Sequence, residues 1–394
     1  MKQPGLMAIL VLSLAVMMPS AQAQTFTVLH EFDSENDGAF PEGGVLRDAK
    51  GNLYGTTTDP GTVFKIDKKG RESIVGLVNG GGLGIFPSGT LAQDAAGNLY
   101  GVNEGDPGAG AIYKLSPKGK GAILFSFQSG LHIDEPQLPA GGVSLDASGN
   151  IFGAAQFGSD QTCGMGCGDI FQLDQVGNLT LLHRFTGGAD GGHPIGPLVQ
   201  DAEGNLYGVA QSGGDRACPE KFEQFPHEGC GVVFKLAKSG ELTVLHIFRG
   251  GKKDGAVPQA GLLLDAAGNL FGTTFTGGPD RFGTVFKIAN DGTYTVLHMF
   301  AESEGENPNG GLVADPAGNL YGTAQVGGDG EDGTAFELSP DGTLKLLHTF
   351  EGLEDGAFPL AGLFRDDQGR LYGTTVTNGL IQFVQGGNVF EITP

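Results

Sequence analysis

Asn52-Leu53-Tyr54-Gly55 is the stretch that decides the fold, because the same phrase returns along the chain. Its copies, which differ only by similar residues, begin at Asn52, Asn98, Asn150, Asn205, Asn269, Asn319 and Arg370. The intervals between successive copies are 46, 52, 55, 64, 50 and 51 residues. Self-similarity at such a period is typical of architectures that assemble many copies of one supersecondary unit. The chain therefore repeats one unit rather than dividing into unrelated domains.

Each copy holds four short runs rich in β-branched and aromatic residues, which is the pattern of strands. The first run ends in Asp, as at residues 311–315, and the second is the Asn-Leu-Tyr-Gly run. The third resembles residues 285–288, and the fourth resembles residues 243–248. A tight Asp-x-x-Gly-Asn turn, as at residues 265–269, joins the first two runs, because Asp bonds downstream backbone and Gly accepts positive φ. Four strands per unit predict a propeller blade.

The ring is expected to close with a strand taken from the N-terminus. A fourth-type run opens the mature chain at residues 27–32, whereas the chain ends on a third-type run at residues 388–392. Laying the first run on the last sheet removes an exposed edge. We therefore predict an all-β, seven-bladed β-propeller with four antiparallel strands per blade, forming one domain over residues 24–394. Its units are expected at residues 33–80, 81–129, 130–186, 187–249, 250–301, 302–351, and 352–394 plus 25–32.

The first 23 residues have the pattern of a secretory signal peptide. Lys2 precedes a short apolar run, and cleavage is expected after Ala23, which makes the protein secreted, either extracellular or periplasmic. The mature chain then holds 22 basic and 45 acidic residues, a net charge of −23 that excludes nucleic acid as a partner. No later segment approaches the roughly 20 apolar residues of a transmembrane helix. We expect a monomer.

Four cysteines occupy equivalent places in two adjacent units. Cys163 and Cys167 bracket a short loop, and Cys218 and Cys230 bracket the longer equivalent loop of the next unit. In an exported protein, an even count with local pairing predicts the disulfides 163–167 and 218–230. A structural zinc site made by all four is the alternative.

The long and variable connections are predicted to share one face of the ring, around the channel mouth, where rigid scaffolds usually carry function. The connection between blades repeats Asp-Gly-x-x-Pro. Its acidic members are Asp37, Asp190, Asp254, Glu304 and Asp355. Together they would form a negative ring able to bind calcium. The alternative is an Asx turn repeated for shape, and no other cofactor is required.

A histidine recurs on the fourth strand of most units, at His30, His183, His246, His298 and His348. One histidine per blade on outer strands would lie too far from the next to share a metal ion. These side chains are expected to satisfy hydrogen bonds between blades.

The motifs Gly-Asn-Leu-Tyr-Gly-Thr-Thr, Gly-Thr-Val-Phe-Lys-Ile and Thr-Val-Leu-His-x-Phe resemble the GloVer tandem repeat of bacterial "choice-of-anchor" surface proteins. The resemblance covers essentially the whole mature chain and implies an exported bacterial protein, often tethered by a C-terminal sorting signal. This chain shows no such anchor after its last strand, so release or retention by a partner is expected. The repeat is also similar to NHL-like and lactonase-like propellers, and the resemblance transfers no catalytic residue.

Three functional hypotheses follow. The leading one is a non-enzymatic binding scaffold whose ligand is a glycan or a protein surface. A purely structural spacer is not separable from it by sequence. The competing one is a hydrolase or lyase, possible also as a metal-dependent enzyme, with its site at the channel mouth. Catalysis needs a unique set of residues, so the candidates are those that break the repeat: His132, Asp134, Glu135, His193, His227, Glu228 and Arg281.

Overall fold

The computed structural model describes residues 24–77, 86–105, 110–127, 136–158, 163, 166–215, 217–219, 229–352, 354–377 and 386–393. The predicted signal peptide at residues 1–23 lies outside the described residues. The helical elements with described bounds are the short 3-10 turns η2 (Gly251–Lys253) and η3 (Glu302–Glu304). Within the described ranges, no helix has the length and hydrophobicity that crossing a bilayer requires.

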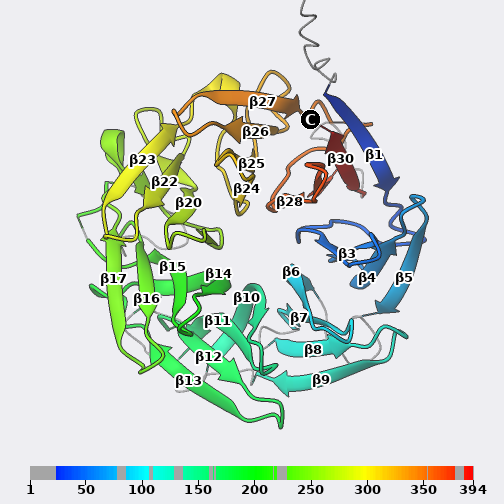
Figure 1. Ribbon diagram of the computed structural model, residues 1–394, viewed down its shortest axis with the longest axis horizontal. Coiled ribbons are helices and arrows are strands. Elements are labelled where there is room, and N and C mark those ends of the chain that lie inside the picture. The colour runs from blue at the N-terminus through cyan, green and yellow to red at the C-terminus, as the bar shows by residue number, and fades with distance from the viewer. Residues whose placement is uncertain are drawn as a thin grey trace, which may run out of the picture.

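The strands form antiparallel four-stranded blades around a central axis (Figure 1). Two adjacent blades join into one eight-stranded sheet through a single parallel pairing of their inner strands, at Thr90 and Gly142. The strands nearest the axis are β2 (Leu46–Arg47), β6 (Pro87–Gln93), β10 (Pro136–Leu145), β14 (Gly192–Gln200), β19 (Leu263–Leu264), β24 (Val313–Ala314) and β28 (Phe364–Arg365). The second strands are β3 (Leu53–Thr57), β7 (Leu99–Asn103), β11 (Ile151–Gly158), β15 (Leu206–Ser212), β20 (Leu270–Thr274), β25 (Leu320–Ala324) and β29 (Leu371–Thr375).

The third and outer strands complete each blade. The third strands are β4 (Thr62–Ile66), β8 (Ala111–Leu115), β12 (Asp169–Leu173), β16 (Val232–Leu236), β22 (Thr284–Ile288), β26 (Thr334–Leu338) and β30 (Asn388–Thr393). The outer strands are β5 (Glu72–Leu77), β9 (Gly121–Ser126), β13 (Leu179–Arg184), β17 (Leu242–Ile247), β23 (Tyr294–Met299), β27 (Leu344–Thr349) and β1 (Thr25–Glu31). A separate two-stranded ladder joins β18 (Gly255–Ala256) to β21 (Thr276–Gly277).

The ring closes as predicted, with the first strand completing the last sheet. The strand order of that sheet is β1-β30-β29-β28, and β1 runs antiparallel to β30. Phe26 lies opposite Ile392, and Glu31 lies opposite Asn388. Figure 1 shows the blue N-terminal strand beside the red C-terminal one. Strand pairing thus joins the two ends of the described chain.

The repeated phrase has a specific physical role in each blade. Asp48 accepts hydrogen bonds from the backbone N–H of Asn52 at 2.8 Å and from the Tyr54 hydroxyl at 3.2 Å, so one carboxylate fixes both the turn and the strand after it. Gly55 lies under the ring of Phe64, where an added Cβ would stand 2.4 Å from the ring. The phrase therefore needs a glycine because the third strand covers it with an aromatic side chain.

Aromatic pairs hold neighbouring blades together. A Phe that follows six of the outer strands packs on the third-strand Phe of the next blade, as Phe32 does on Phe64 with ring centroids 4.9 Å apart. Phe185 meets Phe234 in the same way at 5.3 Å. These rings are almost completely buried. Burial of a Phe stabilises by about 1.5–3 kcal/mol, so the core lies between blades rather than within one blade.

Candidate binding site at the axial mouth

Backbone, rather than side chains, makes the closest contacts between neighbouring blades at the centre of the ring. Within the described residues, the innermost segment of each blade passes so near its neighbour that a side chain would collide. An added Cβ at Gly89 would lie 2.2 Å from the carbonyl carbon of Gly141, and one at Gly141 would lie 2.3 Å from the Cα of Gly196. We call this set the glycine collar: Gly43, Gly89, Gly141, Gly196, Gly261, Gly310 and Gly362.

A cavity of about 210 Å³ lies on the axis against the glycine collar. Several of its walls come from the residue that directly follows the proline of each connection between blades. The side chains of the axial mouth, as we name it, are Glu42, Ile195, Gln259, Asn309 and Leu360. Because each of these residues directly follows a connection between blades, the axial mouth lies on the face of the ring that carries those connections.

The backbone of the rim is held in an uncommon conformation. The residue before each of these prolines has a left-handed backbone, with φ of 54° at His193 and 56° at Val257. The Val257 N–H donates to the Cys230 carbonyl at 2.8 Å, and the Val257 carbonyl accepts from the Phe275 N–H at 3.0 Å. Such strain persists only where the surroundings enforce it. The full set is Phe40, Phe86, Leu138, His193, Val257, Asn307 and Phe358.

Carboxamide groups lie at the ends of the second strands, next to the rim. The Gln156 side-chain NH2 donates to the Gln211 carbonyl oxygen at 3.0 Å, which links two blades. The Asn307 side-chain NH2 donates to the Phe275 carbonyl at 2.8 Å. A carboxamide both donates and accepts hydrogen bonds, so this surface suits a ligand rich in hydroxyl groups.

Two glutamates at the mouth escaped the sequence prediction. The Glu42 side chain reaches solvent but stands in a concave site. Burial there raises its pKa, and the nearby Glu104 carboxylate raises it further. Burial also raises the pKa of Glu104, which follows β7. Both residues break the repeat, since Gln156 and Gln211 fill the place of Glu104 in the next blades. Aligning the copies residue by residue finds them.

The repeated histidines and acidic residues form clasps with one another. In each clasp, the histidine Nε2 lies 2.8–3.4 Å from a carboxylate oxygen of the connection that follows. The carboxylate also accepts a backbone N–H that precedes it, as Asp37 does from Asp33 at 2.7 Å. This geometry differs from an Asx turn, whose partners lie downstream. Four of the histidines are hydrogen-bonded to the carboxylate, whereas His246 Nε2 lies at ion-pair distance, 3.4 Å, from Asp254 without a hydrogen bond. The clasps pair His30 with Asp37, His183 with Asp190, His246 with Asp254, His298 with Glu304, and His348 with Asp355.

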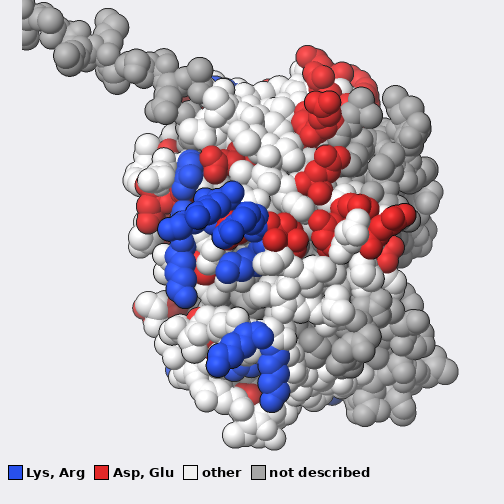
Figure 2. All heavy atoms as spheres, turned by 90° about the vertical axis from the view of Figure 1, so that its right-hand side faces the viewer, with Lys and Arg blue, Asp and Glu red and all other residues white. Residues whose placement is uncertain are grey.

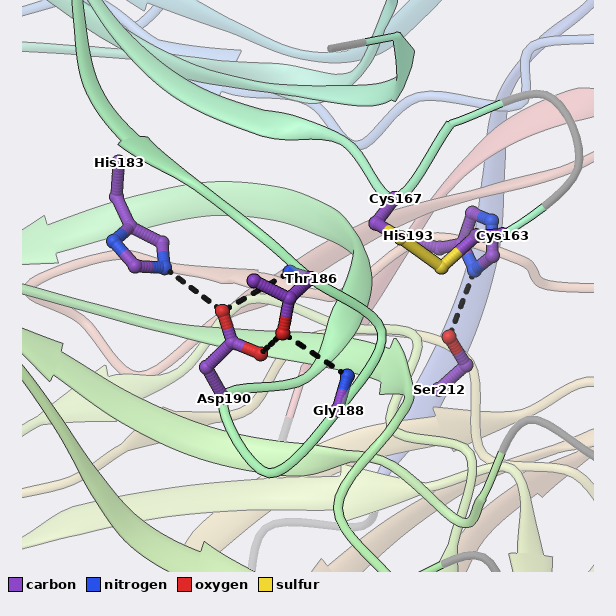
Figure 3. Close-up of a disulfide and its surroundings, with 8 residues drawn as sticks. All are labelled: Cys163, Cys167, His183, Thr186, Gly188, Asp190, His193 and Ser212. Atoms are coloured by element: carbon purple, nitrogen blue, oxygen red, sulfur yellow. Dashed lines mark hydrogen bonds and ion pairs between the residues drawn. A yellow bond between two sulfur atoms is a disulfide. The ribbon is translucent and has the colours of Figure 1, made fainter. Parts of the chain in front are cut away.

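Both predicted disulfides are confirmed, between Cys163 and Cys167 and between Cys218 and Cys230. The zinc alternative is wrong, because every cysteine sulfur is bonded to another sulfur. Figure 3 shows His193 beside the first disulfide, with its Nδ1 2.8 Å from the Ser212 hydroxyl oxygen.

His193 is only 1% exposed. Burial lowers its pKa to about 4, although a backbone hydrogen bond at Gly166 opposes this shift. The side chain is therefore neutral at pH 7. In the same view, Asp190 accepts from Thr186 and His183. Burial opposes the charge of Asp190, but these hydrogen bonds outweigh it and lower its pKa.

Of the other catalytic candidates, the structure describes Arg281 alone. Arg281 is exposed in the loop before β22, where its carbonyl accepts from the Thr276 hydroxyl at 2.9 Å. His132, Asp134, Glu135, His227 and Glu228 lie outside the described residues.

The opposite face, which carries the tight turns, also has hollows. One of about 800 Å³ is lined by residues of the turns after β6 and β10, including Asp94 and Asp146. Another, of about 410 Å³, lies one blade further along and includes Asp201. Asp94 and Asp201 already accept hydrogen bonds from their own turns. The tight-turn face thus offers larger hollows, in which these two aspartates are already engaged by their own turns.

Comparison with known proteins identifies the repeat and the fold. A family profile described as the Gloeobacter/Verrucomicrobia repeat matches residues 15–165, 59–218 and 222–394. No curated protein matches the sequence.

Among solved structures, a streptogramin B lyase is 12% identical, with a TM-score of 0.60 over 94% of this chain and 97% of that one. Virginiamycin B lyase from Staphylococcus aureus is 11% identical, with a TM-score of 0.60 over 94% of this chain and 100% of that one. The extracellular domain of a protein described as a hybrid two-component system from B. thetaiotaomicron is 12% identical, with a TM-score of 0.57 over 93% of this chain and 39% of that one. These likenesses show a shared propeller fold.

Proposed function

The chain belongs to the Gloeobacter/Verrucomicrobia repeat family, and on this premise we propose that it is an exported, seven-bladed ring that binds a glycan at its axial mouth. The number seven rests on the seven copies of the Asn-Leu-Tyr-Gly phrase. Export is supported by the two disulfides, which form and persist in oxidising compartments. Binding without chemistry is the simplest role for such a surface.

One observation carries the proposal: polar side chains line a cavity on the axis beside a rim of fixed backbone. Gln259 and Asn309 line the cavity above the glycine collar, and Glu42 adds a carboxylate. Carboxamides and carboxylates match the alternating donors and acceptors of sugar hydroxyls. A fixed rim also reduces the conformational entropy lost when a ligand binds.

The size of the cavity bears on the form of the ligand. Its volume of about 210 Å³ is below the roughly 300–1,000 Å³ usual for sites that enclose a drug-sized molecule. A glycan would therefore place its terminal sugar on the collar and continue outward over the rim. Phe86, which is 49% exposed at its strained rim position, supplies an apolar surface there.

The test is a glycan array probed with the chain that begins at residue 24. We expect binding to a limited set of glycans and a loss of affinity of about tenfold or more in the double variant Gln259→Ala/Asn309→Ala, because two hydrogen-bonding groups are removed. Glu203→Ala on the tight-turn face is the matched control and should bind normally. Binding to no glycan, or binding that only the control variant weakens, would contradict the proposal.

A second candidate is a lyase or hydrolase acting at the same mouth. The specific observation in its favour is the pair Glu42 and Glu104, because carboxyl groups with raised pKa values serve as general acids near neutral pH. Each glycan bound on the array should be incubated with the protein and its products measured by mass spectrometry. Cleavage that Glu42→Gln abolishes would support the enzyme hypothesis. Glycan that stays intact after long incubation would support the binding scaffold instead.

A further inference from the structure

One of the five His–carboxylate clasps has a different neighbour from the rest. One position near the start of the outer strand, defined by its pairing with an Ile or Leu of the third strand, lies next to the outer strand of the preceding blade, which carries the histidine. Tyr294 stacks on His246 with centroids 3.5 Å apart, and Phe26 stacks on His348 at 3.7 Å. The place next to His30 is occupied by Glu72.

The equivalent positions show that Glu72 is the exception. Glu72 pairs with Ile66 in the ladder of β4 and β5, as Tyr294 pairs with Ile288 in the ladder of β22 and β23. Leu242 has this place beside the His183 clasp, and Leu344 has it beside the His298 clasp. Four clasps therefore meet an apolar or aromatic side chain, and one meets a carboxylate.

The three side chains are close enough to share an ion. One ligand atom each of His30, Asp37 and Glu72 lie within 4.8 Å of one another, and no other group of this kind occurs among the described residues. His30 Nε2 is 2.8 Å from Asp37 Oδ2, and these side chains are only 19% and 16% exposed. Two ligands held about 2.1 Å from a tetrahedral zinc ion lie about 3.4 Å apart. Side-chain movements of about 1 Å, which separate His30 from Asp37 and bring Glu72 closer, would complete this geometry.

The carboxylate of Glu72 is not satisfied by the protein around it. Its Oε1 atom is buried and has no hydrogen-bond partner among the described residues. Burial raises the pKa of Glu72; His30 opposes this shift and Asp37 adds to it. A buried oxygen that lacks a partner and faces a second carboxylate is costly unless a cation compensates both.

We propose that His30, Asp37 and Glu72 bind a divalent transition-metal ion. One imidazole nitrogen and two carboxylate oxygens form a ligand set that suits zinc, manganese or iron(II) better than calcium, which prefers oxygen ligands alone. Three protein ligands leave the remaining positions of the ion to water.

The ion would join three separate parts of the chain at the point of ring closure. His30 belongs to β1, Asp37 to the connection after it, and Glu72 to β5 in the first complete blade. Figure 2 views this side of the molecule, where acidic side chains form a band apart from a group of Lys and Arg. Because the ligand set forms only in the folded ring, the ion stabilises the closed state.

The experiment is calorimetric titration of the chelator-treated chain, starting at residue 24, with Zn²⁺. We expect one tight site and a higher melting temperature with Zn²⁺ than with Ca²⁺. Glu72→Leu, which installs the residue found beside two other clasps, should weaken Zn²⁺ binding at least tenfold and keep the circular dichroism spectrum. The reciprocal variant, Leu242→Glu, should create a second site of similar affinity at His183 and Asp190.

Each alternative result overturns the proposal. Zn²⁺ binding that is absent in the parent chain, or equal in the parent and Glu72→Leu, would show that the three side chains do not form a site. A response to Ca²⁺ alone would assign the cation to the acidic connections instead. If Glu72→Leu fails to fold, the number of Zn²⁺ ions bound by Leu242→Glu still tests the proposal. One bound ion instead of two would refute the proposed ligand set.

Discussion

Single glycines decide whether neighbouring blades can meet at the axis. Gly141 has φ of +81°, and a Cβ there would lie 2.3 Å from the backbone of Gly196. Gly240 has φ of +92° but nothing within 4 Å of the same position. The two residues therefore separate the effect of backbone conformation from that of close approach.

We predict that Gly141→Ala lowers the free energy of unfolding by about 3 kcal/mol or more, since left-handed strain adds to overpacking. Gly240→Ala should cost about 1 kcal/mol, from strain alone. Denaturant unfolding of both variants measures the difference. Equal losses would mean that the collar does not bring the backbones together.

His193 should make the protein sensitive to mild acid. Its pKa in the folded protein is about 4, below the ordinary histidine pKa of 6.5, so the unfolded chain takes up a proton first as the pH falls. Stability is therefore lost between about pH 6.5 and 4, on the order of 3 kcal/mol in total. His193→Asn, which keeps a polar side chain suited to a left-handed backbone, should flatten this dependence in denaturant titrations. Parallel pH curves for the two proteins would argue against a buried neutral imidazole.

Local chemistry made some residue roles predictable. The Asp-x-x-Gly-Asn turn was readable because Asp48 bonds residues within six positions of itself. The roles of Glu42 and Glu104 could not be predicted from the sequence, because their raised pKa values depend on two blades meeting at the axis. The clasps were also not predicted. The sequence shows both the repeated histidines and the repeated acidic residues, but their pairing depends on how the chain bends after the outer strand.

At the scale of elements, β1 is the strand whose placement matters most. Phe26 stacks on His348 with centroids 3.7 Å apart and meets the edge of Phe350 at 5.8 Å, so it fastens β1 to the preceding blade. We predict that Phe26→Ala lowers the free energy of unfolding by about 2 kcal/mol. Thr27→Ala, at an exposed position of the same strand, should change it by less than about 0.5 kcal/mol. Thermal and denaturant unfolding would show the contrast, and similar values for both would place β1 outside the cooperative unit.

The two disulfides should contribute unequally. Cys218 and Cys230 are separated by 12 positions, whereas Cys163 and Cys167 are separated by four. By loop entropy, replacing the first pair with alanine should cost about 3 kcal/mol and replacing the second about 2 kcal/mol. Unfolding of the two double variants, compared without reductant, measures this order. A larger loss from the shorter loop would mean that packing around His193 outweighs chain entropy.

The strand runs were predictable because each combines β-branched and aromatic residues with flanking turn residues. The lengths of the strands were harder to predict. β2 and β28 have only two residues each, whereas β10 has ten. The inner runs shorten where the chain turns toward the collar, and that turn depends on contact with the neighbouring blade.

At the scale of the whole molecule, ring closure determines every surface discussed above. The offset between the first and last runs predicted that β1 completes the final sheet, and the order β1-β30-β29-β28 agrees. The axial mouth exists only if all inner segments meet. The proposed ion site likewise needs β1 beside β5. The proposed glycan site and the proposed metal site therefore both depend on one strand pairing.

Amide hydrogen exchange of β30, Asn388–Thr393, in chains with and without residues 24–33 tests this closure most directly. In the intact chain, β30 is a central strand with β1 on one side and β29 on the other. The account predicts slow exchange in the intact chain, fast exchange in the shortened one, and a lower melting temperature on shortening. Unchanged protection of β30 and an unchanged melting temperature would contradict it.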